Sequence, residues 1–183
     1  AEFSFVGTSD TVTMPAPRSL WDAAGVAQGE PFADLALAVF ALSAVAPSLL
    51  VSALANLRDC LRPGGAILFR DYGRLDLKQL KFARKPNARL PCEGGWEWYS
   101  RGDGTTAAFF DQKKLETLAA EVGLEVEWIN YDKRLIVNRA EVIRMQRVWI
   151  AAVLRKPYEA GTSHSSRARK LVFAATAAFV AGM

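Results

Sequence analysis

The sequence has 183 residues, 51 % of them hydrophobic, and a formal net charge of +4 from 23 basic and 19 acidic side chains. This length suits one domain, and this apolar content excludes a disordered chain because it can build a sizeable core. Its 2 cysteines and single histidine do not supply an ordinary protein metal site. No apolar run reaches the roughly 20 residues that a membrane span requires.

The amino-terminal part of the chain contains one clear element. Residues 1–31 give poor signals, apart from an apolar opening at residues 3–6 that favours a short strand. Residues 33–42 form a continuous apolar run of strand length, which is typical of a parallel strand covered on both faces.

A helix and a second strand follow that run. Leu50, Leu54 and Leu57 recur at spacings of four and three, which predicts an amphipathic helix ending before Pro63. The next apolar run, residues 66–70, predicts a strand after a Pro-Gly-Gly turn. Together these elements form a parallel strand, helix, strand unit of Rossmann-like type.

Three polar residues end the second strand of this unit. Arg70, Asp71 and Tyr72 stand at its carboxyl end, where open α/β sheets hold their ligands. We expect the first candidate site here. The alternative for Arg70 and Asp71 is an internal ion pair that closes the strand, because buried charges seldom remain unpaired.

The middle of the chain predicts irregular structure. Residues 74–98 carry a basic stretch followed by an aromatic cluster that includes Trp96, Trp98 and Tyr99. Cations interleaved with rings suit a nucleic-acid surface, since cations meet phosphates and rings stack on bases. The alternative is a solvated loop whose tryptophans pack onto the core.

The last elements are a helix and two strands. Asp111 predicts an N-cap for a helix through Val122, and Gly123 predicts its left-handed stop. The strands at residues 124–131 and 147–155 are joined too closely for a crossover helix, which favours an antiparallel pair. The chain therefore predicts an α/β fold: a partial class I, Rossmann-like sheet that closes with an antiparallel hairpin.

Several stretches in consistent order resemble the S-adenosylmethionine-dependent methyltransferases that make 3-methylcytidine in tRNA. They are VFALSAVAP, LRPGGAILFRDYGRLDLKQLKF, WYSRGDGTTAAFF and VNRAEVIRMQRVWIAAVLRKP. The resemblance covers residues 32–157, which we interpret as the carboxyl-terminal part of a methyltransferase-like domain. Residues 1–31 are then a poorly defined amino-terminal segment, and residues 158–183 a linker and an apolar tail.

The resemblance implies site residues. Arg70 and Asp71 would face the reaction centre, with Asp71 accepting from the exocyclic amine of an unpaired cytosine. Tyr72 would stack on the base or donate to it. Further substrate-binding positions implied by the family are Ser43, Arg101, Asp103, Asn138, Arg139 and Arg147.

The chain also departs from the family. A class I methyltransferase holds its cofactor through a Gly-rich turn after the first strand and an acidic residue after the second. Neither is found, so we expect that this chain alone does not bind S-adenosylmethionine. Four positions where the family has large groups are small here, namely Ala46, Thr106, Ala108 and Ala151.

Three functions remain open from the sequence. The chain is a degenerate, non-catalytic relative that serves as a structural subunit of a larger assembly, which we favour, or the carboxyl portion of an active tRNA methyltransferase, or an RNA-binding module. An exposed sheet edge predicts other protein chains as partners. The apolar residues 170–183 favour docking on a partner, on a membrane surface or on the domain itself.

Overall fold

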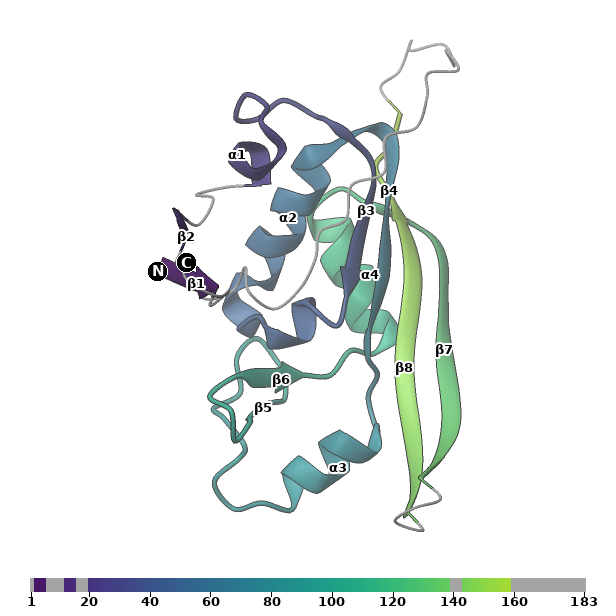
Figure 1. Cartoon of the computed structure of the whole chain (residues 1–183). Helices are drawn as coiled ribbons and strands as arrows, with labels where there is room; N and C mark the ends of the chain where they lie inside the picture. The colour runs from purple at the N-terminus through teal and green to yellow at the C-terminus, as the bar shows by residue number, and fades with distance from the viewer. Residues whose placement is uncertain (1, 6–11, 16–19, 139–142, 159–183) are drawn as a thin grey trace.

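The computed structural model describes residues 2–5, 12–15, 20–138 and 143–158, with side chains described only from residue 20 onwards. Its main feature is a mixed four-stranded sheet with helices against one face (Figure 1). The elements in chain order are β1 (Glu2–Phe5), β2 (Val12–Pro15), α1 (Leu20–Ala24), β3 (Ala33–Val39), the 3-10 turns η1 (Leu42–Ala44) and η2 (Pro47–Leu49), α2 (Leu50–Cys60), β4 (Leu61–Tyr72), α3 (Leu77–Ala83), β5 (Trp98–Ser100), β6 (Thr106–Ala108), α4 (Gln112–Glu121), β7 (Glu125–Asn138) and β8 (Ile143–Arg155).

The sheet has the strand order β3-β4-β8-β7. β3 and β4 are parallel and are joined through α2, whereas β8 runs antiparallel to both of its neighbours. Two smaller antiparallel pairs, β1 with β2 and β5 with β6, lie outside this sheet. The predicted α/β class and the predicted terminal antiparallel hairpin are both confirmed.

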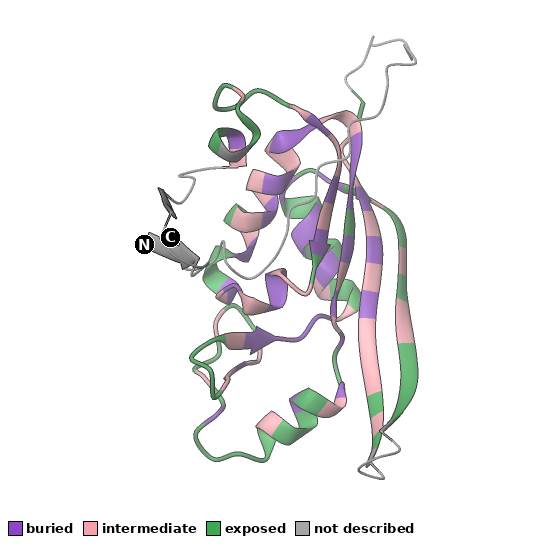
Figure 2. Ribbon diagram, viewed as in Figure 1, coloured by how far each residue is buried: buried purple, intermediate pink, exposed green. Residues whose placement is uncertain are grey.

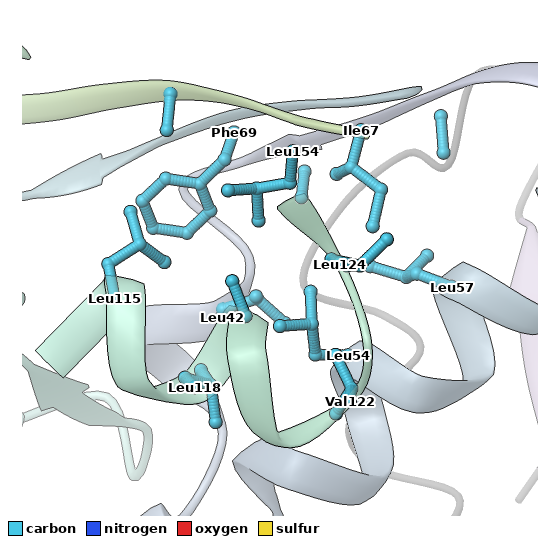
Figure 3. Packing of buried hydrophobic residues seen from close by; sticks show 14 of the residues in the cluster. Leu42, Leu54, Leu57, Ile67, Phe69, Leu115, Leu118, Val122, Leu124 and Leu154 are labelled. Carbon is cyan, nitrogen blue, oxygen red and sulfur yellow. The ribbon is translucent and has the colours of Figure 1, made fainter. Parts of the chain in front are cut away.

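The core lies between the sheet and the helices α2 and α4 (Figure 2). Leu54 of α2 and Leu115 of α4 are fully buried, and Ile67 and Phe69 of β4 point toward the same side. Figure 3 shows these side chains together in one cluster. Burial of each such side chain contributes about 1.5–3 kcal/mol, so the alternation along β4 fixes which face is covered.

The caps of α4 are as predicted. The Asp111 carboxylate accepts a hydrogen bond from the Lys114 amide at 2.8 Å, which satisfies a free N–H of the first turn. Gly123, with φ of +71°, ends the helix in the left-handed region.

Two local predictions are corrected. The segment 74–98 is not wholly irregular, because it contains the helix α3, capped by Asp76. The terminal strands are longer than predicted: β7 and β8 remain paired from Glu125 with Arg155 to Asn138 with Ile143. Beyond Tyr72, the last residue of β4, the hairpin continues alone past the sheet (Figure 1).

The second face of the sheet is partly open within the described residues. Leu68 of β4 is 37 % exposed and Trp128 of β7 is 50 % exposed, and cross-strand pairing through β8 places both on the face opposite Phe69. The outer edge of β3 pairs with no described strand. A sheet containing a parallel unit is ordinarily covered on both faces, and the part of the chain that the structure describes leaves this face and this edge uncovered.

Candidate functional site

The carboxyl ends of β3 and β4 carry two strained residues. Phe40 has φ of +51° and Leu75 has φ of +67°, a left-handed backbone that costs a non-glycine residue about 1–2 kcal/mol. Such strain is concentrated at functional sites. The Phe40 ring lies beside two other rings. Its centroid is 5.1 Å from the centroid of Tyr72 and 6.0 Å from that of Trp149.

Asp71 is fully buried at this end of the sheet. Its carboxylate accepts hydrogen bonds from the backbone amide of Ser43 at 2.9 Å and from the backbone amide of Tyr72, the next residue, at 2.8 Å. Burial raises the pKa of Asp71 from 3.8 to about 6, while the hydrogen bonds from Ser43 and Tyr72 and the charge of Arg101 oppose that rise. The carboxyl group therefore changes its protonation state close to neutral pH.

Arg70 is not the partner of Asp71, because neighbouring residues of a strand point to opposite faces. The Arg70 guanidinium instead forms an ion pair with Asp132 of β7 at 2.6 Å and lies 4.8 Å from the centroid of the Trp149 ring. The expected internal pair between Arg70 and Asp71 is thus absent. Each charge has its own partners, Asp71 on the core side and Arg70 on the open face.

Tyr72 lies between two further guanidinium groups. Those of Arg101 and Arg147 are 5.5 and 5.6 Å from the centroid of its ring, a distance at which a cation is attracted to an aromatic face. Arg147 is also 5.5 Å from the Trp149 ring. We call these side chains, Phe40, Tyr72, Trp149, Arg70, Arg101 and Arg147, the aromatic–arginine cluster.

Arg147 is held in the cluster by Asp76. The fully buried Asp76 carboxylate accepts from Arg147 Nε at 2.8 Å and from the Val148 amide at 2.8 Å, and its other oxygen caps α3 through the Lys78 amide. The side chain of Arg147 is only 14 % exposed. Asp76 thus fixes α3, β8 and one guanidinium at the same place.

Trp149 Nε1 is a buried polar atom of the cluster with no hydrogen-bond partner among the described residues. Ser43 Oγ is buried as well, but the Ser43 side chain acts on the Asp71 carboxylate and lowers its pKa. A buried polar atom left without a partner costs about 1–3 kcal/mol.

The other predicted residues are placed differently. Asp103 is exposed in the loop between β5 and β6, where its carboxylate accepts from the Thr105 amide at 3.0 Å and from the Thr105 hydroxyl at 2.6 Å. These bonds hold the pKa of Asp103 below its usual value. Asn138 ends β7, and its side chain is outside the described residues, as is all of Arg139. The apolar residues 170–183 are outside them too.

Trp96 and Tyr99 of the middle segment favour the packing interpretation. The Trp96 ring lies 5.1 Å from Phe110 in the core, and Tyr99 is 2 % exposed. Neither ring is free to stack on a base. Two further rings of the cluster, Phe40 and Trp149, were not identified from the sequence. Nor was the role of Asp76 as the anchor of Arg147.

The described residues do not fit S-adenosylmethionine. Its binding in class I enzymes needs a Gly-rich turn between a parallel strand and a helix, but β3 runs through Val39 and Phe40 directly into η1. Gly73 follows β4, yet a side chain there would meet Val148, so this glycine serves packing against β8. Within the same residues, no cluster of metal-ligating side chains is found, and no helix is long and apolar enough to cross a membrane.

Comparison with known proteins gives relatives of one kind. The chain is 42 % identical over 130 residues to a tRNA N(3)-cytidine methyltransferase of Homo sapiens, a match that covers 71 % of this chain and 33 % of that protein. It is 42 % identical over 124 residues to a tRNA N(3)-methylcytidine methyltransferase of Drosophila melanogaster, covering 68 % and 36 % of the two chains. A tRNA(Thr) (cytosine(32)-N(3))-methyltransferase of Saccharomyces cerevisiae is 40 % identical over 124 residues, covering 68 % and 19 %.

No protein-family model matches the chain. Among solved structures, a SAM-dependent methyltransferase from Methanosarcina mazei is 19 % identical with a TM-score of 0.49, over 69 % of this chain and 60 % of that one. The chain spans about a third of the length of the human and fly relatives. With about 40 % identity over about 70 % of its residues, the chain belongs, in that region, to the family of the tRNA N(3)-cytidine methyltransferases.

Proposed function

We propose that this chain is the RNA-binding, acceptor side of a tRNA cytosine-N3 methyltransferase domain. The observation that carries the proposal is the aromatic–arginine cluster, which stands next to the buried carboxylate of Asp71 at the carboxyl end of β4. Aromatic rings stack on an unpaired base, guanidinium groups bind its phosphates, and a carboxylate accepts from the exocyclic amine of cytosine.

The chemistry of cytosine supports this assignment. Methylation at N3 leaves a positive charge on the base, and a carboxylate that accepts from the exocyclic amine stabilises that charge. Asp71 has the right chemical character, but it is fully buried on the core side of β4, so this end of the sheet must open before a base reaches the carboxylate. We expect Tyr72 to stack on the base and Arg101, for which the described residues form no ion pair, to bind a neighbouring phosphate.

Basic side chains next to the cluster suit the rest of an RNA. Lys78 and Lys81 of α3 and Arg84 and Lys85 just after it are exposed, and no ion pair engages them among the described residues. They adjoin the cluster because Asp76, the cap of α3, binds Arg147. A track of cations beside stacking rings is the usual design of a single-strand RNA surface.

We further propose that the chain transfers no methyl group by itself. S-adenosylmethionine would supply the methyl group in such an enzyme, and the described residues lack a place to hold it. The open edge of β3 and the exposed face at Leu68 and Trp128 favour a role as a subunit, or as one part, of a larger assembly. The small residues Ala46, Thr106, Ala108 and Ala151 support a degenerate site.

Filter binding of the chain to tRNA across a salt series tests RNA binding. We expect affinity to fall steeply with salt, and Tyr72→Ala and Arg101→Gln to weaken binding roughly tenfold each. Lys113→Gln, an equal loss of charge on the exposed face of α4, is the matched control. Binding that is absent at low salt, or that both variants leave intact, overturns the proposal.

Calorimetry with S-adenosylmethionine tests the second part. We expect no heat of binding with the chain alone. Micromolar affinity would overturn the view that the cofactor needs residues from another polypeptide or segment.

A further inference from the structure

A pocket lies beside the cluster, between α3, the segment before β5 and the start of α4. Its volume is about 250 Å³. It is lined by Arg74, Gln79, Gly95, Glu97, Phe109 and Lys114. The ring of Phe109 is 3 % exposed and lies 5.9 Å from the Tyr72 ring, so it forms a wall between this pocket and the aromatic–arginine cluster.

Carboxylates engage the two cations of this pocket only weakly or not at all among the described residues. Arg74 is 62 % exposed and forms a long ion pair, 4.0 Å, with one oxygen of Asp111, whose other oxygen caps α4. Lys114 Nζ donates to the Gly95 carbonyl at 2.9 Å and lies 4.7 Å from the centroid of the Trp96 ring, and no ion pair engages it within the described residues. Both therefore retain donors that can meet an anion.

The remaining polar groups do not offset those charges. The Glu97 carboxylate is paired with Arg89 at 2.6 Å, from outside the lining. Gln79 is 6 % exposed; its Oε1 accepts from the Leu75 amide at 2.7 Å, whereas its Nε2 meets Glu97 only at 3.5 Å. The strong acceptors are thus engaged, and an ammonium, a guanidinium and an amide N–H remain as donors.

We propose that this pocket binds a phosphate group through Arg74 and Lys114, with Gln79 Nε2 as a third donor. The position one ring away from Tyr72 suits the phosphate of a nucleotide next to the one stacked in the cluster. The assignment of this phosphate to an RNA rests on the proposed RNA-binding function. A free nucleotide carries the same phosphate group and is the other molecule that could supply it.

The test compares Arg74→Gln and Lys114→Gln with Lys113→Gln, which removes one charge from the neighbouring position of α4 but does not line the pocket. Fluorescence polarisation with a short single-stranded RNA gives the affinity at several salt concentrations. Each lining variant should weaken binding about tenfold and lower the slope of log affinity against log salt by about one. The control Lys113→Gln should change the affinity and the salt slope less than the lining variants do. Equal changes in all three variants overturn the proposal.

Calorimetry with CMP and with inorganic phosphate separates the two sources. If the wild type binds CMP but no RNA, and Arg74→Gln does not bind CMP, the pocket is a site for free nucleotides and the RNA proposal fails. If RNA binds and neither lining variant differs from the control, the pocket proposal fails and the RNA proposal stands. Arg74 packs against little, so its variant tests the pocket even if Lys114→Gln disturbs the loop at Gly95.

Discussion

Asp76→Ala is expected to lower the free energy of unfolding by about 4 kcal/mol. The wild-type carboxylate is fully buried and accepts from Arg147 Nε, from the Val148 amide and from the Lys78 amide, each at 2.8 Å. Removing one partner from a buried ion pair costs about 3–5 kcal/mol because the other charge stays buried. Loss of the α3 cap adds about 1 kcal/mol, and the two effects overlap in one network, so we expect less than their sum.

Urea unfolding of the full chain at neutral pH measures this change. Arg147→Met and the double variant complete a cycle, in which the double variant should be more stable than the two single effects predict, because neither charge is then left alone. Asp103→Ala removes an exposed carboxylate that also accepts two hydrogen bonds, and it should leave the unfolding midpoint nearly unchanged. A loss below about 1 kcal/mol for Asp76→Ala, or strict additivity, would refute the role given to this pair.

Two further outcomes concern Asp71 and the glycine turns. Because burial raises the pKa of Asp71 to about 6 from 3.8, its contribution to stability is complete below about pH 4 and is lost as the pH rises through 6, by roughly 3 kcal/mol. Unfolding measured from pH 4 to 7 should show that decline in the wild type and not in Asp71→Asn; parallel profiles would contradict it. Gly64 has φ of +77° and Gly25 has φ of +66°. An added Cβ at Gly64 meets only the far end of the Tyr158 side chain, which is 53 % exposed and can turn away, and at Gly25 it meets open space. Thermal melts should therefore show Gly25→Ala and Gly64→Ala each costing about 1 kcal/mol, and a cost at Gly64 several times larger would show that the Tyr158 ring is fixed there.

The elements that the sequence predicts well are those with a local signal. The leucine spacing before Pro63 and the cap at Asp111 each lie within one helix, so α2 and α4 were predicted close to their observed bounds. α3 was missed because it buries only Gln79 and has no apolar stripe. Its only signal was Asp76, whose capping role a single acidic residue does not reveal by itself.

The candidate site at the end of β4 was predicted only where a local sequence signal points to it. The rule that ligands lie beyond the carboxyl ends of strands placed Asp71 and Tyr72 correctly at the end of β4. Phe40 and Trp149 were missed because their meeting depends on the register that pairs Tyr72 with Trp149 across the sheet. A period of two in one strand says which residues share a face, but it does not say which residue of another strand lies opposite.

The length of β8 has a consequence for motion at this site. One uninterrupted strand carries Leu154 in the dry core and Trp149 in the cluster, and at both residues it lies between β4 and β7. Backbone that belongs to a central strand exchanges its amide hydrogens only in large openings of the molecule. The Trp149 side of the cluster is therefore rigid, and whatever makes room for a guest must come from the short turns around Phe40 and Arg101.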